Sequence, residues 1–293
     1  MSSHIGIDWG STNLRAWYCQ HGEYIETRRL EAGITRLNGP TPAEIFDSIT
    51  HGWPVQDVPV VMTGMIGSNA GWVPVPYLSC PVVLNELCHH LTRVENKVWI
   101  VPGLSVERAD NRNVIRGEET QLPGATQLQP APLYVMPGTH ARWVQTEGAL
   151  VLDFRTVMTG ELHHLLLRQS LIGAGLPTQQ EDATVFHHGL ETGINDASIM
   201  SRLFEVRAAH VLGALDRRYV SEFLSGLLIG HEVTQMTQQA MVDRTQPVVV
   251  IADEALAQRY CQALNLIDLK SVTLAGDCAF RQGIRRIANE LAN

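Results

Sequence analysis

Residues 5–17 of the chain read IGIDWGSTNLRAW. Two apolar runs, Ile5–Asp8 and Leu14–Cys19, flank a Gly-Ser-Thr turn, which is the pattern of a β-hairpin. A glycine at a tight hairpin lets backbone N–H groups approach a phosphate closely, and Ser and Thr hydroxyls add hydrogen-bond donors. We therefore expect Gly10, Ser11 and Thr12 to form a phosphate-binding turn.

A similar segment lies about half a chain length further on, where residues 133–143 read LYVMPGTHARW. When Gly10 and Gly138 are aligned, the arginines miss by one position, so the repeat is approximate and two unrelated hairpins are the alternative. Two such turns facing each other across a cleft could hold a triphosphate, with Thr139 in the second. Asp8 could then bind Mg²⁺ through water, because hard cations prefer carboxylate oxygen; a lone Asp at a strand end more often forms a turn.

The composition excludes several classes of protein. With 293 residues, 45% of them hydrophobic and 18% charged, the chain has ample apolar material for one large domain or two moderate ones. The net charge of −8 disfavours a nucleic acid or an anionic membrane as partner.

The distribution of cysteine, histidine and apolar residues narrows the setting. The five cysteines are widely spread and lack a CxxC pair, so we expect reduced thiols rather than disulfides or a zinc site. The paired histidines lack HExxH spacing. The start MSSHIGIDWG lacks the features of a signal peptide, and no apolar run approaches a membrane span. We expect a soluble, cytoplasmic protein.

Strand-like and helix-like segments alternate along the chain, which indicates an α/β fold. Beyond the two hairpins, the expected strands are Val58–Met62, Val98–Val101, Pro247–Ile251 and Ser271–Leu274. The expected helices are Pro42–His51, Leu84–Arg93, Glu161–Leu171, Ser221–Thr237, Glu254–Leu264 and Ala279–Leu291. The Pro-, Gly- and Gln-containing stretch Pro123–Pro132 is the candidate boundary, so we expect an N-terminal lobe at 1–126 and a C-terminal lobe at 127–293.

Four segments, in this order, resemble the two phosphate motifs, the adenosine motif and the closing helix of the actin/hexokinase/heat-shock ATPase superfamily. They are Asp8–Thr12, Met136–His140, Val248–Asp253 and Val272–Gly283. Within that superfamily the chain is most similar to the sugar-acid kinases of the 2-dehydro-3-deoxygalactonokinase family. The segments that carry this closer resemblance are Asp8–Trp17, Gly33–Asn38, Thr63–Trp72, Arg116–Gln121, Met136–Thr139, Phe154–Leu167 and Phe223–Gly230.

The resemblance implies two ribonuclease H-like lobes with the active site in the cleft between them. It also implies ATP and Mg²⁺ as cofactors, and transfer of phosphate to the terminal C6 hydroxyl of 2-dehydro-3-deoxy-D-galactonate in galactonate catabolism. Two positions depart from the superfamily pattern. Met136 stands where many members carry an acidic residue, and Ala252-Asp253 stands where a Gly-Gly pair is common.

The resemblance also implies roles for single residues. Sugar kinases of the superfamily place an acidic base after a glycine shortly before the second phosphate turn, and in this chain that base is Glu118. Glu119 and Asp153 are the alternative bases. The structural alternative is that Glu118 only caps its helix. The expected nucleotide-binding residues are Gly10, Ser11, Thr12, Gly138, Thr139, Asp253 and Gly276. The expected substrate-binding residues are Arg15, Ser68, Asn69, Arg116 and Arg155, because Arg suits a carboxylate and the loop from Gly64 to Trp72 resembles a substrate loop. Asp8 is the expected metal ligand and contributes to catalysis.

Other functions stay open at this point. The chain could phosphorylate another sugar or sugar acid, or it could be a non-catalytic sugar sensor. Such regulators carry a DNA-binding helix-turn-helix, and this chain begins at its first strand without a basic extension. Chaperone-like and actin-like ATPases are longer or carry filament insertions. The expected partners are therefore a small sugar acid and ATP, with no nucleic acid or membrane, and a homodimer is one assembly consistent with the sequence.

Overall fold

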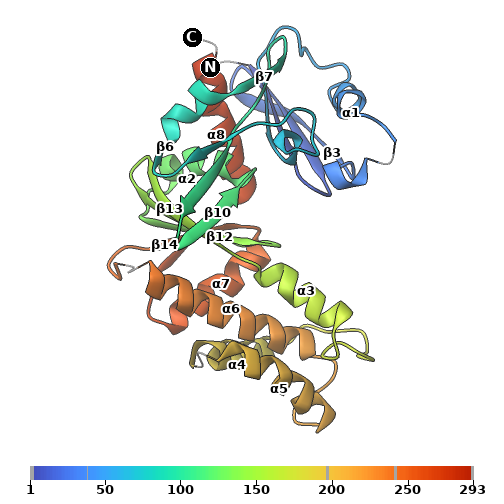
Figure 1. Ribbon diagram of the computed structural model, residues 1–293, viewed down its shortest axis with the longest axis vertical. Coiled ribbons are helices and arrows are strands. Elements are labelled where there is room, and N and C mark those ends of the chain that lie inside the picture. Colours follow the sequence, from blue (N-terminus) through green and yellow to red (C-terminus); the bar gives the residue numbers. More distant parts are fainter. Residues whose placement is uncertain (1–2, 38, 196–197, 241–242, 292–293) are drawn as a thin grey trace. The chain divides into compact units, whose positions relative to one another are not determined.

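The structure is a computed structural model whose chain divides into two compact units. The first unit comprises residues 1–130, 146–154 and 276–293, and the second comprises residues 131–145 and 155–275 (Figure 1). The described residues are 3–37, 39–195, 198–240 and 243–291. Asn38, which ends one of the segments resembling the kinase family, lies outside them.

The first unit is built on a six-stranded sheet with the order β3-β2-β1-β4-β8-β7. Strands β1, β2 and β3 are antiparallel neighbours, β1, β4 and β8 are parallel, and β7 is antiparallel to β8. The strands are β1 (His4–Trp9), β2 (Leu14–Gln20), β3 (Glu23–Leu30), β4 (Val60–Gly64), β7 (Thr92–Glu95) and β8 (Val98–Ile100).

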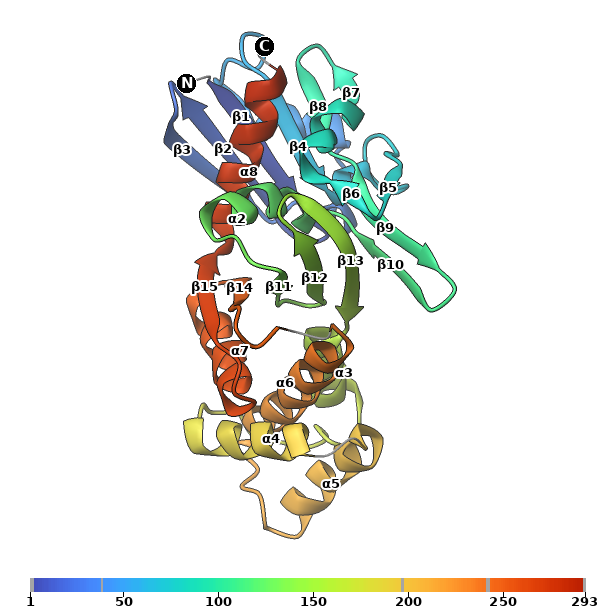
Figure 2. The same cartoon turned by 90° about the vertical axis from the view of Figure 1, so that its left-hand side faces the viewer.

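Strand β1 lies inside the sheet, between β2 and β4, and both of its faces are covered. Ile5, Ile7 and Trp9 enter a core that also contains residues of α1 (Pro42–Ile49), a helix that begins with a Thr41–Glu44 capping box. On the other face lies α8 (Gly276–Leu291), which Figure 2 shows crossing the sheet. Gly6 permits this packing, because a Cβ there would lie 2.8 Å from a side-chain carbon of Ile284.

Shorter elements complete the first unit. A second, three-stranded sheet has the order β10-β9-β5, and β6 pairs with the start of β13. These strands are β5 (Tyr77–Ser79), β6 (Val82–Val83), β9 (Gly103–Arg108) and β10 (Asn111–Ile115). The remaining helices are α2 (Leu122–Leu128) and the 3-10 turns η1 (Ile34–Arg36), η2 (Met65–Gly67), η3 (Leu84–His90) and η4 (Glu118–Thr120).

The second unit repeats part of this strand order. Its β11 is antiparallel to β12 and parallel to β14, and β14 is parallel to β15. In the first unit, β1 is likewise antiparallel to β2 and parallel to β4, and β4 is parallel to β8. The strands are β11 (Leu133–Met136), β12 (Ala141–Glu147), β13 (Leu150–Val157), β14 (Val248–Ala252) and β15 (Ser271–Ala275). The helices are α3 (Thr159–Gln169), α4 (Ala183–Asn195), α5 (Ile199–Val211), α6 (Val220–Gln239) and α7 (Glu254–Leu266).

This duplicated β-hairpin with parallel strands confirms the predicted α/β class and the two ribonuclease H-like units. Some predicted elements were wrong: Leu84–His90 is a 3-10 helix and Thr92–Arg93 begins β7 instead of ending a helix. The stretch Pro123–Pro132 contains most of α2, and the first change of unit follows it at Pro130. Residues 146–154 and 276–293, expected in the C-terminal lobe, belong to the first unit, since α8 packs on α2 and β1.

Candidate active site

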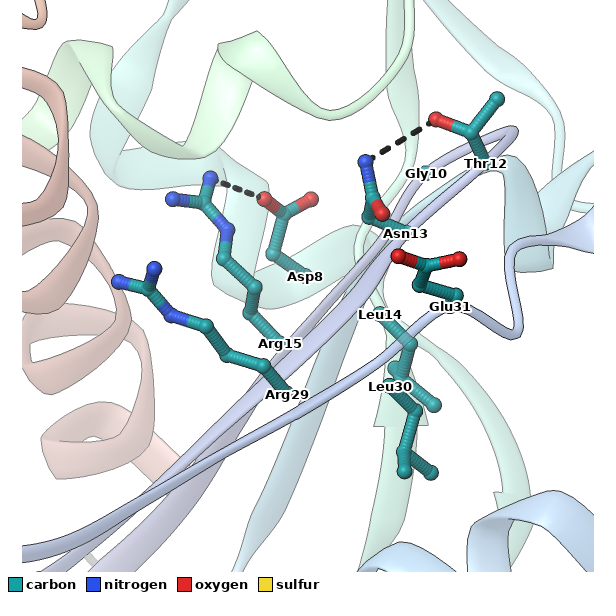
Figure 3. A pocket seen from close by; sticks show the side chains of 9 residues that line it. All are labelled: Asp8, Gly10, Thr12, Asn13, Leu14, Arg15, Arg29, Leu30 and Glu31. Carbon is teal, nitrogen blue, oxygen red and sulfur yellow. Dashed lines mark hydrogen bonds and ion pairs between the residues drawn. The ribbon is translucent and has the colours of Figure 1, made fainter.

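The β1–β2 hairpin lines a cavity of about 690 Å³ in the first unit (Figure 3). The backbone N–H of Gly10 donates to the carbonyl of Asn13 at 2.9 Å and closes the turn, whose residues 11–13 are exposed. The side chain of Asn13 donates to the Thr12 hydroxyl at 3.1 Å. The lining residues are Asp8, Gly10, Thr12, Asn13, Leu14, Arg15, Arg29, Leu30 and Glu31.

The loop before η1 supports this turn from behind. The amide of Gly33 donates to Thr12 O at 3.1 Å, and the amide of Thr35 donates to Ser11 O at 2.9 Å. A Cβ on Gly33 would lie 2.3 Å from the carbonyl of Ser11, so only glycine permits this approach. Because the carbonyls of Ser11 and Thr12 accept hydrogen bonds from this segment, the backbone of the turn is held in one conformation.

Charged side chains meet at one wall of the cavity. Arg15 lies between two carboxylates, with Nη2 2.7 Å from Asp8 Oδ2 and Nη1 2.6 Å from Asp277 Oδ1, and Arg29 lies 3.7 Å from Asp277. Burial disfavours the charge of Arg15, but the attraction of Asp8 and Asp277 outweighs it and raises the pKa of Arg15. Asp277 stands in the first turn of α8, where the helix dipole favours a carboxylate.

Sequence reasoning missed Asp277, although it named Gly276 next to it. A signal for a helix start was present, because acidic residues are enriched in the first turn of a helix, as Asp277 is after Gly276. The structure adds that Arg15, expected at the substrate, is held by Asp8 and Asp277.

The expected substrate loop follows β4. Its Ser68 hydroxyl donates to Met65 O at 2.7 Å, so this side chain shapes the turn, whereas Asn69 is exposed. Arg116 packs beneath the loop: Nη2 donates to Val75 O at 2.6 Å, and the guanidinium lies 4.2 Å from the centroid of the Tyr77 ring. Within the described residues, the buried Nη1 of Arg116 has no hydrogen-bond partner.

The turn at Gly117 presents the two adjacent glutamates differently. Gly117 has φ +120°, a conformation that favours glycine, and leads into η4. Glu119 is fully buried and accepts hydrogen bonds from the Thr63 hydroxyl at 2.6 Å and from the amide of Gly117. Burial raises the pKa of Glu119 to about 8, against the effect of the Thr63 hydrogen bond. Glu118 is only half-buried.

Asp153, the third candidate for the base, is bound by its neighbours. Arg108 Nη2 lies 2.6 Å from Oδ2, and the amide groups of Asn111 and Phe154 each donate to Oδ1 at 2.8 Å. All of these residues belong to the first unit, and Asp153 lies within β13. The arrangement is that of a structural carboxylate. Of the three candidates, Glu118 is the half-buried residue that lies directly after Gly117.

The second hairpin is supported in the same manner as the first. Gly138 and Thr139 are exposed, and the amide of Glu161 in α3 donates to Thr139 O at 2.9 Å. A Cβ on Gly160 would lie 2.3 Å from the carbonyl oxygen of Gly138. His140 Nε2 lies 2.6 Å from the carboxylate of Glu161. Each expected phosphate turn is therefore backed by a glycine on another segment.

A buried carboxyl group holds the start of α3. Glu232 of α6 is 2% exposed and accepts hydrogen bonds from Trp143 Nε1 at 2.7 Å, Tyr260 OH at 2.8 Å and the Thr159 hydroxyl. Burial raises its pKa to about 7, although the three hydrogen bonds lower it. Glu232 thereby joins β12, α3 and α7 to α6. Sequence reasoning missed it, because a single Glu in a helix shows no sign of its partners.

The two other expected residues of the second unit have simpler surroundings. Asp253 is the N-cap of α7 and accepts a hydrogen bond from the amide of Leu256 at 3.0 Å. This capping role is sufficient to explain an Asp at that position. Arg155 lies half-buried on β13. Among the described residues, no group of three or more His, Cys, Asp and Glu side chains is arranged to hold a metal ion, and no helix is long and apolar enough to cross a bilayer.

Comparison with known proteins gives a match along nearly the whole chain. The family model described as 2-keto-3-deoxy-galactonokinase matches residues 8–287. The chain belongs to the 2-keto-3-deoxy-galactonokinase family. It is 53% identical over 290 residues to the 2-dehydro-3-deoxygalactonokinase of Escherichia coli (strain K12), with 99% of each chain covered. It is 30% identical over 300 residues to a second protein named as this kinase from Rhizobium meliloti (strain 1021), covering 98% of this chain and 97% of the relative.

Solved structures agree with this family membership. A crystal structure assigned as a 2-dehydro-3-deoxygalactonokinase from Sinorhizobium meliloti has a TM-score of 0.90 at 29% identity, covering 98% of this chain and 99% of that one. The activator of 2-hydroxyisocaproyl-CoA dehydratase from Clostridium difficile, with bound ADPNP, has a TM-score of 0.55 at 13% identity, covering 99% and 95%. The latter likeness shows that this chain and the activator share a fold.

The structure sorts the residues expected from the family resemblance by unit. In the first unit, Asp8, Gly10, Thr12 and Arg15 line one cavity together, and Asp277, next to Gly276, binds Arg15. In the second, Gly138 and Thr139 form one turn. The roles of all these residues, and the meeting of the two turns at one nucleotide, stay predictions.

Proposed function

We propose that this chain transfers the γ-phosphate of ATP to the C6 hydroxyl of 2-dehydro-3-deoxy-D-galactonate, giving the 6-phosphate and ADP. The observation that carries the proposal is the 53% identity, over 99% of both chains, to a kinase named for this substrate. The exposed, internally fixed turn at Gly10–Asn13 supports it, because such turns suit phosphate oxygens. The proposal places the enzyme in galactonate catabolism in the cytoplasm, where the five unpaired cysteines would stay reduced.

The phosphates of the nucleotide would be held by the turns at Gly10–Thr12 and Gly138–Thr139. Gly276, after β15, and Asp253, after β14, follow parallel strand ends of the kind that border such sites. Mg²⁺ would be bound by Asp8 together with phosphate oxygens and water, which matches its preference for few carboxylates. The ion supplies charge neutralisation when bound. A single carboxylate suffices for this, and Asp8 reaches the cavity.

In the transfer step, the C6 hydroxyl oxygen bonds to the γ-phosphorus as the bond to the β,γ-bridging oxygen breaks. The hydroxyl proton passes to the carboxylate of Glu118, and ADP leaves with the bridging oxygen. Gly117, at φ +120°, sets the position of Glu118, and buried Glu119 holds that turn against β4. Glu119 is thus a positioning residue.

The substrate carboxylate would be bound by arginine. Arg116 supports this, because its buried Nη1 has no partner within the described residues, and the loop at Ser68 and Asn69 lies above it. Arg15 would contribute after exchanging one of its two carboxylate partners, and Arg155 would act from the second unit. A homodimer remains part of the proposal.

An ADP-release assay across a panel of sugars tests the activity. Turnover with 2-dehydro-3-deoxy-D-galactonate and Mg-ATP is expected, with none for neutral sugars, and ³¹P NMR should show a phosphomonoester on C6. Turnover with a different sugar acid alone would correct the substrate. Binding of the sugar acid without any ADP release would favour a sensor and overturn the kinase assignment.

A further inference from the structure

Helix α5 of the second unit is apolar on two sides. Its inner face is buried, where Leu203 and Val206 pack with Ile172 and with Leu224 of α6. On its outer side, five apolar residues recur at i, i+4, i+8, i+11 and i+12, a spacing that aligns them along one face of a helix. These residues, which we call the α5 stripe, are Met200, Phe204, Ala208, Val211 and Leu212.

The large members of the α5 stripe are open to solvent. Met200 is 78% exposed, Phe204 66%, Val211 62% and Leu212 82%. Together they present on the order of 500 Å² of apolar surface, which is at the upper end for a patch on a monomer. Single exposed apolar residues are normal, but a helix with a continuous second apolar face has something to cover it.

We propose that the α5 stripe docks a second copy of this chain, with the two α5 helices antiparallel about a two-fold axis near Ala208. A two-fold interface brings the same patch of both copies together, so the stripe must be complementary to itself. The small side chain of Ala208, at the centre of the stripe, lets the two helices approach each other there. Phe204, four residues before it, then packs between Val211 and Leu212 of the other copy.

The area agrees with this occupant. Two such stripes bury about 1,000 Å² of apolar surface, and the polar rim around them brings the total into the range of about 1,200–2,000 Å² typical of stable interfaces. None of the five stripe residues is charged. The core of the contact would therefore resemble that of a homodimer interface.

Other occupants agree less well with the surroundings of the stripe. Helices that bind anionic lipid carry unpaired basic residues on their polar face. Here Arg202 pairs with Glu205, and Arg207 is the other arginine of α5, so the helix does not carry a basic face. The chain also has a net charge of −8. The residues outside the described ranges occur in runs of one or two, too short to cover a helix of 13 residues.

The test is the mass of the intact protein in solution, by light scattering after gel filtration over a concentration series. We expect a dimer for the wild type and a monomer for Phe204→Glu and for Leu212→Glu. Both positions are exposed, Phe204 within α5 and Leu212 at its C-cap, so far-UV circular dichroism should be unchanged and Tm should change little. Ile25→Glu, which places the same charge on 53% exposed Ile25 of β3, is the control and should stay dimeric.

Three results would overturn the assignment. One is a wild type that stays monomeric over the whole series. Another is a dimer that persists in both stripe variants, since it would use a different face. The third is sedimentation of the wild type with phosphatidylglycerol vesicles that Phe204→Glu abolishes, which would assign the stripe to a membrane surface.

Discussion

Arg15 binds the carboxylate of Asp8 and also that of Asp277, so one guanidinium joins two carboxylates at this wall of the cavity. A metal ion arriving at Asp8 would compete with Arg15 for the same oxygen. Asp277 gives Arg15 a second partner, so the guanidinium would remain paired when Asp8 turns to the ion. The Asp8–Arg15–Asp277 arrangement thus accommodates a change of partner without leaving a buried charge unpaired.

Asp8→Asn removes the charge with almost no change of shape. We expect kcat to fall by at least about 10²-fold, since a site group that neutralises phosphate charge commonly contributes this much. Tm should change little, because the Arg15–Asp277 pair remains. The measurement is kcat over a Mg²⁺ titration, with Asp47→Asn on the surface of α1 as the control. Near-normal turnover at saturating Mg²⁺ would exclude Asp8 from the role.

Glu118→Gln and Glu119→Gln separate the base from its neighbour. Loss of a general base lowers kcat by about 10²- to 10⁴-fold, and Glu118→Gln should do so while the KM for ATP stays unchanged. Glu119 holds its proton at neutral pH because its pKa is raised to about 8, and Gln mimics that neutral form, so kcat should remain within a few-fold.

Both variants are measured for kcat and Tm together. A Glu118→Gln enzyme with lowered Tm and full kcat would show a helix-capping role, which is worth about 1 kcal/mol. In that case the search for the base moves to other carboxylates. A large fall in kcat for Glu119→Gln alone would reverse the assignment within the Gly117 turn.

At the scale of elements, the two hairpins were predictable, whereas the helices α2, α4 and α5 were not. Apolar runs around Gly-Ser-Thr and Gly-Thr identify β1–β2 and β11–β12 from the sequence, because the turn chemistry is local. Helix α4 was missed, since its sequence ATVFHHGLETGIN contains two glycines that lower helix propensity. The structure shows why they are there.

Helices α4 and α6 approach each other closely enough for backbone contact. A Cβ on Gly189 or Gly193 of α4 would lie 2.3 or 2.2 Å from carbonyl oxygens of α6, and one on Gly226 would lie 2.2 Å from the Phe186 carbonyl of α4. The helix-weakening glycines are therefore the residues that let the pair pack. Tertiary packing of this kind cannot be read from one segment, and the same limit hid Asp277 and Glu232, whose partners are distant in sequence.

Gly33→Ala and Gly160→Ala test whether the segments behind the two turns position them. Each new Cβ would lie 2.3 Å from a turn carbonyl, so the turn must move, at a cost of about 1–3 kcal/mol in stability. We expect the KM for ATP to rise in both variants. Gly138→Ala is the steric contrast, because the nearest atom to its Cβ is 3.9 Å away and Tm should be kept. Unchanged ATP binding in both Gly33→Ala and Gly160→Ala would contradict a role for these turns.

At the scale of the molecule, each unit repeats a hairpin with parallel strands. In the part of the chain that the structure describes, each unit also has a buried carboxyl group with a raised pKa. In the first unit this is Glu119, at about 8, and in the second it is Glu232, at about 7. Which residues join which unit was only partly predictable. Residues 276–293 belong to the first unit because α8 packs over Gly6. The composition of the chain does not reveal this packing.

These two carboxyl groups determine how stability should depend on pH. In the unfolded chain a Glu loses its proton near pH 4.5, whereas the folded units keep theirs up to about pH 7 and 8. Between those values the native state binds more protons, so the free energy of unfolding falls as pH rises. The half-buried His163 and the buried His210 have pKa values that burial lowers, and they act in the opposite direction, mainly below about pH 6.5.

Between pH 6.5 and 8, the change of stability with pH should therefore come mainly from the two carboxyl groups, with the larger part from Glu119. One pKa unit corresponds to about 1.4 kcal/mol, so stability should fall by roughly 1 kcal/mol per pH unit here. Urea midpoints at pH 6.5, 7, 7.5 and 8 measure this. Glu119→Gln, which cannot titrate, should flatten the slope, Glu232→Gln should do so only below pH 7, and exposed Glu23→Gln should leave it unchanged. A wild-type midpoint that is constant or rises over this interval would mean that Glu119 is ionised in the native protein, and the turn at Gly117 would then hold a buried charge instead of a proton.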